Sequence, residues 1–216
     1  MASQKVFMKM VVIGDSGVGK TTLLQQYINQ RGDKSNKPTI GADLFKEELE
    51  IDGQKVAIQI WDTAGQERFH ALGFSFYKGA DCCALVYDVT NPKSFESLEK
   101  WKKGFIDNSS PSDTSTFPFC VFGNKADKVE ERAISEEEEQ KWCEENHIKD
   151  HFSTSAKTAM NVKEAFYSMI EKALARAKKA SMPKPGSIIG KDRPIRGTKL
   201  QRGGKPQDRL QNVCEC

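Results

Sequence analysis

The chain has 216 residues, of which 38% are hydrophobic and 29% charged, and it carries a net charge of +3. This composition predicts a soluble globular domain of ordinary type. No segment approaches the ~20 consecutive apolar residues that span a bilayer, and the N-terminus lacks the apolar stretch of a secretory signal. We therefore expect a cytosolic protein without a membrane-spanning helix.

The charge is unevenly distributed along the chain. From Lys178 onward there are ten basic and three acidic residues, a net +7 that leaves −4 for the remainder of a chain of +3. Beyond Ala180 the sequence is rich in Pro, Gly, Lys and Arg and too poor in apolar residues to form a core. We expect a globular domain over residues 1–179 and a disordered basic tail over 180–216, with the tail facing any anionic surface.

Strands and helices alternate through the first half of the domain. The apolar run Val6–Ile13 predicts a buried strand, followed by a glycine-rich turn and a helix over Thr21–Asn29. Polar residues 30–37 predict a loop. Two further strands, Asp43–Ile51 and Lys55–Trp61, are separated by Asp-Gly, which is typical of a hairpin.

The second half continues the alternation. Thr63–Gly79 is expected to begin as a loop and become an irregular helix, and Asn91 with Pro92 to open another helix. Ser135 followed by Glu138 is the pattern of a capping box, and the acidic residues of that first turn favour the helix dipole. Asn161 and Glu164 predict the same cap for the last helix. The remaining elements are strands over Cys82–Val89, Phe117–Gly123 and His151–Thr154, and the last helix over Asn161–Lys179.

This order predicts a three-layer α/β domain. We expect a six-stranded, mostly parallel sheet with one antiparallel strand, flanked by about five helices.

The segment Gly14–Thr21 matches the pattern of a phosphate-binding loop, in which a glycine and four residues precede Gly-Lys-Thr. Glycines let backbone N–H groups approach a phosphate, and the following helix N-terminus favours anions. Lys20 supplies a cation, and the Thr21 hydroxyl is a ligand for Mg²⁺. The fold class is therefore a P-loop nucleotide-binding fold, and the residues expected at the phosphates are Asp15, Ser16, Gly17, Val18, Gly19, Lys20, Thr21 and Thr22.

The loop alone does not identify the nucleotide, but Asn124-Lys125-Ala126-Asp127 follows a predicted buried strand. This motif resembles the base-recognition motif of Ras-superfamily GTPases. A carboxylate at Asp127 can accept hydrogen bonds from the N1–H and the exocyclic amine of guanine, a donor pair that adenine lacks. This argues against an ATP-using P-loop kinase. Ser155, Ala156 and Lys157 resemble the supporting motif, with the Ala156 N–H directed to the guanine carbonyl.

Trp61-Asp62-Thr63-Ala64-Gly65-Gln66-Glu67 is the third nucleotide motif. Asp62 ends a strand, where it can hold Mg²⁺ through a water. The resemblance implies that Gly65 senses the γ-phosphate, that Gln66 orients the attacking water and that Thr39 closes over Mg²⁺ and the γ-phosphate. Ordering of these segments by GTP and their release after hydrolysis would constitute a switch.

The chain further resembles the Rab family from about Val6 to Lys178, and again at its last three residues. The Rab-like stretches include Ile40–Asp43, Gln66–Phe69, Phe76–Ala80 and Asp88–Thr90, and several resemble the late-endosomal Rab-seven branch. The resemblance implies a GTP-hydrolysing switch that recruits effectors in vesicle traffic towards the lysosome or vacuole. The alternative is a guanine-nucleotide-binding adaptor that does not hydrolyse GTP or exchanges nucleotide rapidly.

Family partners follow from the same resemblance: an exchange factor, a GTPase-activating protein, a Rab escort protein or GDP-dissociation inhibitor, and effectors. Trp61 and Tyr77 match aromatic residues that effectors contact in Rab proteins, although both are equally compatible with core packing. We expect a monomer. The expected effector surface comprises Ile40, Leu44, Phe45, Trp61 and Tyr77.

Cys214-Glu215-Cys216 ends the chain and resembles the Rab double-cysteine ending, in which both thiols carry geranylgeranyl groups. An unmodified or metal-binding pair is the alternative. Two lipid groups suffice for stable anchoring, and a basic tail adds attraction to anionic lipid. The tail contains no aromatic residue for base stacking, which argues against nucleic-acid binding. We expect a cytosolic protein that is peripheral on endomembranes, at the late endosome, lysosome or vacuole.

Three positions depart from the Rab pattern. Gly32 stands where the family usually has an aromatic residue that covers guanine, and Asn36 where a tyrosine often flanks the phosphates. Leu44 replaces the phenylalanine expected after Ala-Asp, with Phe45 next to it. Loss of a base-stacking ring worth ~1–3 kcal/mol predicts faster nucleotide release than is usual for a Rab protein.

The other reactive residue types have ordinary interpretations. Cys82, Cys83, Cys120 and Cys143 lack zinc-site spacing and are expected as buried free thiols. His70, His147 and His151 have no evident catalytic partner and are expected at the surface or in packing.

Overall fold

The fold is known from a computed structural model, which describes residues 5–28, 42–63, 76–111 and 113–181. Six strands form one sheet in the order β2-β3-β1-β4-β5-β6. β2 is antiparallel to β3, and all other neighbouring strands are parallel. The predicted sheet is therefore confirmed, with strands β1 (Val6–Ile13), β2 (Ala42–Ile51), β3 (Gln54–Thr63), β4 (Cys82–Asp88), β5 (Phe119–Asn124) and β6 (Asp150–Ser153).

The hairpin between β2 and β3 forms at the predicted Asp-Gly turn. Asp52 and Gly53 have φ values of +50° and +74°. Positive φ at both central residues matches the turn type whose twist suits a two-residue hairpin. The turn places Ile51 opposite Gln54 and so fixes the register of the two strands.

Four α-helices lie within the described residues: α1 (Lys20–Ile28), α3 (Pro92–Ser109), α4 (Glu136–Glu145) and α5 (Val162–Ser181). A short 3₁₀ helix, η2, spans Val129–Glu131. The irregular helix expected before Gly79 falls mostly outside the described residues, and only its end at 76–77 is seen as helical. None of the helices in the described ranges is long and apolar enough to cross a membrane.

The helix caps agree with the sequence at two of three places. Asn91 caps α3 by accepting from the Lys93 N–H, and Ser135 with Glu138 forms a full capping box on α4. The box expected on the last helix is wrong. Asn161 has a φ of +53°, and its amide donates to the Ser153 carbonyl at 2.9 Å. An N-cap residue has extended backbone dihedrals, which this positive φ does not match, and the side chain instead tethers α5 to the end of β6.

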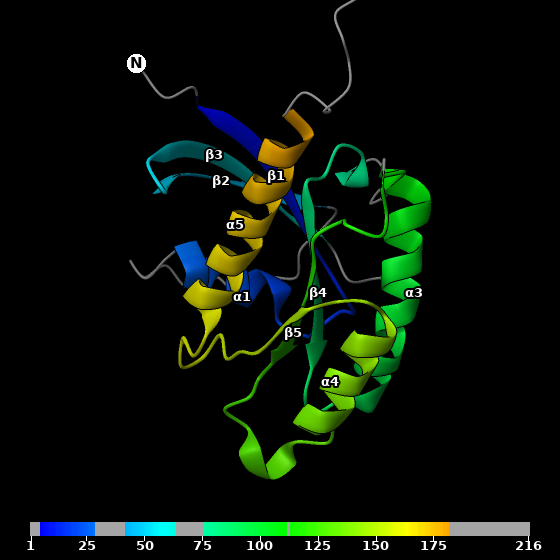
Figure 1. The fold of residues 1–216 in the computed structure, drawn as a ribbon. Coiled ribbons are helices and arrows are strands. Elements are labelled where there is room, and N and C mark those ends of the chain that lie inside the picture. The colour runs from blue at the N-terminus through cyan, green and yellow to red at the C-terminus, as the bar shows by residue number, and fades with distance from the viewer. Residues whose placement is uncertain (1–4, 29–41, 64–75, 112, 182–216) are drawn as a thin grey trace, which may run out of the picture. The chain divides into compact units, whose positions relative to one another are not determined.

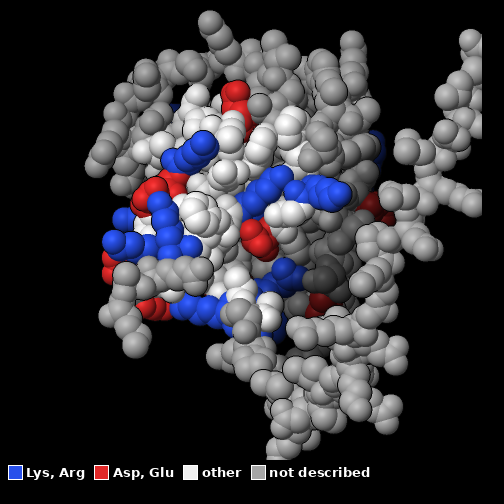
Figure 2. Space-filling view, turned by 90° about the horizontal axis from the view of Figure 1, so that it is seen from above, with Lys and Arg blue, Asp and Glu red and all other residues white. Residues whose placement is uncertain are grey.

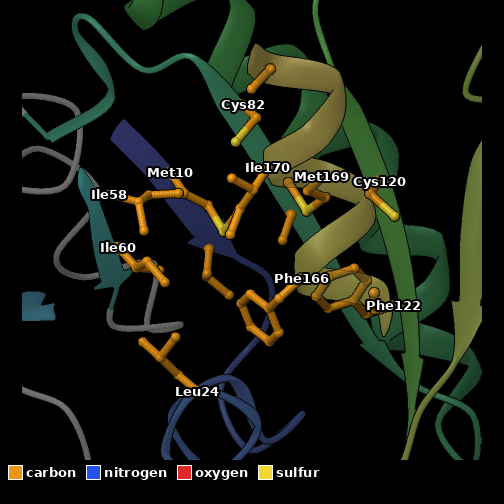
Figure 3. Close-up of a cluster of buried hydrophobic side chains, with 14 of the residues drawn as sticks. Met10, Leu24, Ile58, Ile60, Cys82, Cys120, Phe122, Phe166, Met169 and Ile170 are labelled. Atoms are coloured by element: carbon orange, nitrogen blue, oxygen red, sulfur yellow. The ribbon is translucent and has the colours of Figure 1, made fainter. Parts of the chain in front are cut away.

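Two hydrophobic clusters hold the three layers together. α1 and α5 cover one face of the sheet, and α3 and α4 cover the other (Figure 1). In the first cluster, Phe166, Met169 and Ile170 of α5 point towards Met10 of β1 and Phe122 of β5 (Figure 3). The second is rich in aromatic rings, with Phe105 of α3 packed between several of them. The four domain cysteines are buried free thiols whose pKa is raised by burial, as expected of inert packing residues: Cys82, Cys83, Cys120 and Cys143.

This topology positions the functional residues. Parallel strands bring their carboxyl ends to one edge of the sheet, and ligands of open α/β sheets bind there. The segments that follow β1, β4, β5 and β6, together with the end of β3, therefore meet at this edge. These segments and the last residues of their strands contain the phosphate-loop pattern, Asp88, the Asn124–Asp127 motif, the Ser155–Lys157 motif and Asp62.

Candidate functional site: a nucleotide cradle at the edge of the sheet

The phosphate-loop segment connects β1 to α1, as the sequence predicts. Gly14 begins the loop and lies directly against β4, because a Cβ at this position would stand 2.1 Å from the Val86 carbonyl oxygen. Only glycine fits this close approach of two backbones. The loop then turns into α1, which starts at Lys20 and presents its N-terminus to the loop.

Lys20 is buried, and its ammonium lies inside the loop. Its Nζ donates to the carbonyl oxygens of Gly14 and Asp15, at 2.8 Å each. Burial lowers the pKa of Lys20 to about 8, against the opposing effect of the Asp62 and Asp15 carboxylates. Most of the ammonium therefore keeps its charge at neutral pH, in the position where an anionic ligand of the loop would meet it.

Thr21 and Asp62 bring two oxygen ligands together. The Thr21 hydroxyl donates to Asp62 Oδ2 at 2.5 Å, and Asp62 is fully buried at the end of β3. Hydroxyl and carboxylate oxygens are ligands that Mg²⁺ prefers, and Mg²⁺ in nucleotide sites relies on few protein ligands besides phosphate. This pair fits that role. Within the described ranges, no group of three or more His, Cys, Asp or Glu residues could hold a metal by itself.

The remaining residues of the phosphate-loop segment differ in their exposure to solvent. Ser16 and Gly17 are exposed at its tip, and Val18 is buried beneath. Thr22 is exposed on the first turn of α1.

Asn124 joins the loop to the predicted base site. Its amide Nδ2 donates to the Val18 carbonyl at 2.7 Å, and its Oδ1 accepts from the Ala156 N–H at 3.2 Å. The side chain is buried, so these bonds fix the three segments relative to one another. The phosphate loop, the end of β5 and the Ser155–Lys157 segment thus form one continuous cradle.

Asp127 lies in the same cradle and is held from two sides. The Ser155 hydroxyl donates to Asp127 Oδ1 at 2.6 Å, and Lys157 Nζ lies 3.9 Å from Oδ2. Only 15% of the Asp127 side chain is exposed. The carboxylate is thereby oriented and largely screened from water, which strengthens any hydrogen bond that it accepts from a ligand.

The predicted effector residues do not share one surface. Leu44 of β2 stands opposite Trp61 of β3, which stacks on Phe76 with ring centres 4.9 Å apart. Phe45 belongs to the other side of the sheet, where it packs on the cluster beneath α1 and α5. Tyr77 is 2% exposed and packs against Phe105. Tyr77 is therefore a core residue. The apolar side chains that remain together in this region are Leu44, Trp61 and Phe76.

Several predicted residues fall outside the described residues. They are Thr39, Ile40, Gly65, Gln66, Cys214 and Cys216, together with the departures Gly32 and Asn36.

Two contacts of the cradle are not predicted by the sequence. Trp101 Nε1 of α3 donates to Asp15 Oδ1 at 2.7 Å, and Lys125 Nζ lies 2.6 Å from Asp88 Oδ2. Both join segments that are distant in the chain, and no local pattern marks either pair. Only knowledge of the strand order could have predicted them.

The fold and the cradle together define a P-loop nucleotide-binding protein. Comparison with known proteins narrows this class. The model of the Ras family matches residues 9–175. Ras-related protein Rab-7b of Paramecium octaurelia is 46% identical over 92% of this chain and 98% of its own length. Ras-related protein Rab-7a of Dictyostelium discoideum is 45% identical over 86% of this chain and 91% of its own.

The chain belongs to the Ras family of small GTPases and is a Rab-7-like member of it. Its class binds GTP and GDP, hydrolyses GTP and acts as a switch in vesicle trafficking. The comparisons lend no support to the alternative of an adaptor that does not hydrolyse GTP.

Proposed function

We propose that the cradle binds the phosphates of GTP and GDP in the loop over 15–22 and the guanine ring against Asn124 and Asp127. The observation that carries this proposal is the pair of hydrogen bonds made by Asn124. They tie the loop that suits phosphate to the segment that suits guanine. A single ligand with both groups matches that arrangement.

Asp127 selects the base in this proposal. Guanine offers an N1–H and an exocyclic amine side by side, and a carboxylate accepts from both. The Ser155 hydroxyl restrains one carboxylate oxygen, so the orientation is set before the base arrives. Adenine lacks this donor pair and would leave the carboxylate poorly satisfied, which is costly in a screened site.

Asp127→Asn tests the choice of base. The substitution replaces one acceptor by a donor, so guanine should lose a hydrogen bond and meet a repelling N–H group. We expect GDP affinity to fall ~100-fold, and affinity for xanthosine diphosphate, which has a carbonyl in place of the amine, to rise. Fluorescent-nucleotide competition measures both, with the exposed Glu130→Gln as control. Unchanged discrimination between GDP and ADP in Asp127→Asn would refute the assignment.

Lys20, Thr21 and Asp62 serve the phosphate end. Lys20 supplies positive charge within the loop, and Thr21 with Asp62 would hold Mg²⁺ together with Thr39. Bound Mg²⁺ neutralises charge on the phosphate oxygens. Thr21→Ala should therefore weaken GTP binding and make it insensitive to added Mg²⁺, which titration with and without EDTA measures.

Hydrolysis is assigned to Gln66, with Thr39 and Gly65 as the residues that sense the γ-phosphate. This assignment rests on the sequence motifs. Single-turnover hydrolysis by the native chain and by Gln66→Leu, each with and without a Rab-activating protein, tests it. We expect the native chain to be accelerated by the partner and Gln66→Leu to stay slow. Equal rates for both would exclude the assignment.

We further propose that Cys214 and Cys216 carry geranylgeranyl groups that attach the protein to late endosomes, lysosomes or the vacuole. Each buried CH₂ of such a chain contributes ~0.8 kcal/mol, so two chains anchor stably where one does not. A tagged chain should colocalise with lysosomal markers, and a Cys214→Ser/Cys216→Ser variant should become cytosolic. Retention of the double variant on membranes would oppose the proposal.

The family's partners complete the proposal: an exchange factor, a GTPase-activating protein, an escort protein or dissociation inhibitor, and effectors. Leu44 is 41% exposed beside the half-buried Trp61, which makes this pair the apolar contact that we assign to effectors. Leu44→Asp should abolish capture of a Rab-7 effector by the GTP-loaded protein without changing nucleotide release. Loss of nucleotide binding in the same variant would place Leu44 in a different role.

A further inference from the structure

A partly buried ion pair links the base-recognition segment to the end of the neighbouring strand β4. Lys125 follows β5, and its Nζ lies 2.6 Å from Oδ2 of Asp88, the last residue of β4. The parallel register pairs Asp88 with Asn124, so the carboxylate stands beside the start of the segment that carries Lys125 and Asp127. Only 9% of the Asp88 side chain and 33% of the Lys125 side chain are exposed.

Both oxygens of the Asp88 carboxylate are engaged. Oδ1 accepts from the Thr90 N–H at 2.9 Å and from the Thr90 hydroxyl at 2.8 Å, while Oδ2 faces Lys125. Burial raises the pKa of Asp88, but the hydrogen bonds from Lys125 and Thr90 outweigh it, and the net pKa lies below its ordinary value. The group is therefore a fixed negative charge at neutral pH.

Lys125 needs such a fixed partner. Its backbone has a φ of +66°, and its carbonyl accepts from the Lys128 N–H at 3.0 Å, so the main chain turns sharply at this residue. Its side chain, by contrast, has four rotatable bonds whose freedom must be lost when it adopts one position. A carboxylate that is itself held by Thr90 restricts the ammonium to one place.

We propose that Asp88 is a positioning residue of the nucleotide site, which holds Lys125 in place between Asn124 and Asp127 before nucleotide binds. The proposal rests on the proposed function, which places the guanine ring against Asn124 and Asp127, the two residues on either side of Lys125-Ala126. A lysine that is ordered in advance loses less conformational entropy on binding, so nucleotide is held longer.

The competing explanation is a purely structural one. Asp88 also caps the turn after β4 through Thr90, and its backbone N–H donates to the Ser94 hydroxyl at 3.0 Å. Loss of the side chain could then act through that turn alone. A double-mutant cycle with Lys125 separates the two explanations, because only the positioning role depends on the lysine.

The experiment measures the release of a fluorescent GDP analogue from the full chain in Mg²⁺ buffer, for native protein, Asp88→Asn, Lys125→Ala and the double variant. Asn keeps an oxygen acceptor for Thr90 but removes the charge that faces Lys125. We expect Asp88→Asn to release GDP ~10-fold faster than native protein. We expect the double variant to be no faster than Lys125→Ala.

Thr90→Val is the matched control, because it removes one bond to Oδ1 and leaves the ion pair with Lys125. It should release GDP at close to the native rate. Urea denaturation of every variant reports stability separately. Should Asp88→Asn fold poorly, Asp88→Glu keeps the charge but displaces it by one methylene; it should show a smaller acceleration that also disappears with Lys125→Ala.

The outcomes distinguish failure of the proposed function from failure of the positioning role of Asp88. If Lys125→Ala releases GDP no faster than native protein, the proposed place of Lys125 in the base site is wrong. Two other outcomes would overturn the positioning role of Asp88 and leave the proposed function standing. In the first, Lys125→Ala releases GDP faster than native protein but Asp88→Asn releases it at the native rate. In the second, Asp88→Asn accelerates release further in the double variant than Lys125→Ala does alone.

Discussion

Single residues of the phosphate loop are constrained in two different ways. Gly14 lacks room for any side chain because of its contact with Val86, whereas a Cβ at Gly17 would meet nothing within 4 Å. Gly17 is constrained only by its φ of +79°. Gly14 has a φ of +147°, so a side chain there would meet both an unfavourable backbone conformation and the Val86 carbonyl, whereas at Gly17 only the backbone conformation opposes it.

Gly14→Ala should lower the free energy of unfolding by ~2 kcal/mol or more, because the new methyl group would push β1 and β4 apart. Gly17→Ala should cost ~1 kcal/mol, the price of a left-handed backbone for an L-residue. Urea denaturation of both variants without nucleotide measures the difference. Equal losses would show that the contact with Val86 relaxes easily.

The prediction of fast nucleotide release depends on Gly32, which lies outside the described residues. If the missing aromatic ring leaves guanine uncovered, Gly32→Phe should slow the release of a fluorescent GDP analogue, by between about fivefold and a hundredfold for a stacking gain of ~1–3 kcal/mol. Gly32→Leu controls for bulk without a π-face. Identical release rates for Gly32→Phe and native protein would remove the basis for expecting fast exchange.

Among the elements, α4 shows how a short sequence signal fixes a helix end. The Ser135 hydroxyl accepts from the Glu138 N–H at 3.1 Å, and the Glu138 carboxylate accepts from the Ser135 N–H at 3.0 Å. Four acidic residues in the first turn add to the same effect through the helix dipole. The helix then packs on the sheet through Cys143 and Glu139, which are both buried.

Ser135→Ala should lower the free energy of unfolding by ~1 kcal/mol, because one helix N–H loses its acceptor. Glu138→Gln is the matched control, since glutamine also completes a capping box. Chemical denaturation gives both values. A loss in Glu138→Gln as large as that in Ser135→Ala would mean that charge, and not the capping geometry, stabilises this end.

Glu139 makes α4 sensitive to pH. Burial raises the pKa of its carboxyl, and the nearby Tyr87, His151 and Arg132 oppose that rise without cancelling it, while Glu136 adds to it. The folded protein therefore takes up a proton at higher pH than the unfolded chain, in which the pKa of this carboxyl is near 4.5. As pH falls from neutral towards 4.5, the contribution of Glu139 to stability must increase.

Glu139→Gln removes this dependence. Relative to native protein, the variant should gain stability at pH 8, where the native residue carries a buried charge, and lose that advantage near pH 5. Urea denaturation across this range measures the difference, with the exposed Glu145→Gln as control. A constant difference between native protein and Glu139→Gln at all pH values would contradict the raised pKa.

At the scale of the whole molecule, charge is unequally divided along the sequence. On the face seen in Figure 2, basic and acidic side chains of the described residues are interspersed. The excess of positive charge belongs to the sequence from Lys178 onward. Binding of nucleotide and attraction to a membrane are therefore expected to depend on different parts of the chain.

A variant that ends at Ser181, the last residue of α5, tests this division. It should keep the unfolding free energy, GDP affinity and GTP hydrolysis of the full chain, because the cradle and both hydrophobic clusters lie before that point. It should no longer bind vesicles that contain anionic lipid. A large loss of stability would show that the residues after 181 pack on the domain.

The sequence by itself determined the fold class, the hairpin turn, two helix caps and the phosphate and guanine motifs. Each depends on residues within a few positions of one another, whose spacing has a direct physical meaning. The tertiary structure alone decided which distant residues meet. Asn124 reaches Val18 across 106 positions because the strand order brings β5 beside the loop after β1. Asp88 reaches Lys125 because β4 and β5 are neighbours in register.

The difference between local sequence pattern and tertiary structure also explains why the predicted effector residues do not share one surface. Leu44 and Phe45 are adjacent in sequence, but alternation along β2 directs them to opposite faces of the sheet. Phe45 therefore cannot replace the aromatic residue missing at 44, and Tyr77 is taken up by the core. Composition and spacing cannot reveal this, because the outcome depends on which face of each strand the helices cover.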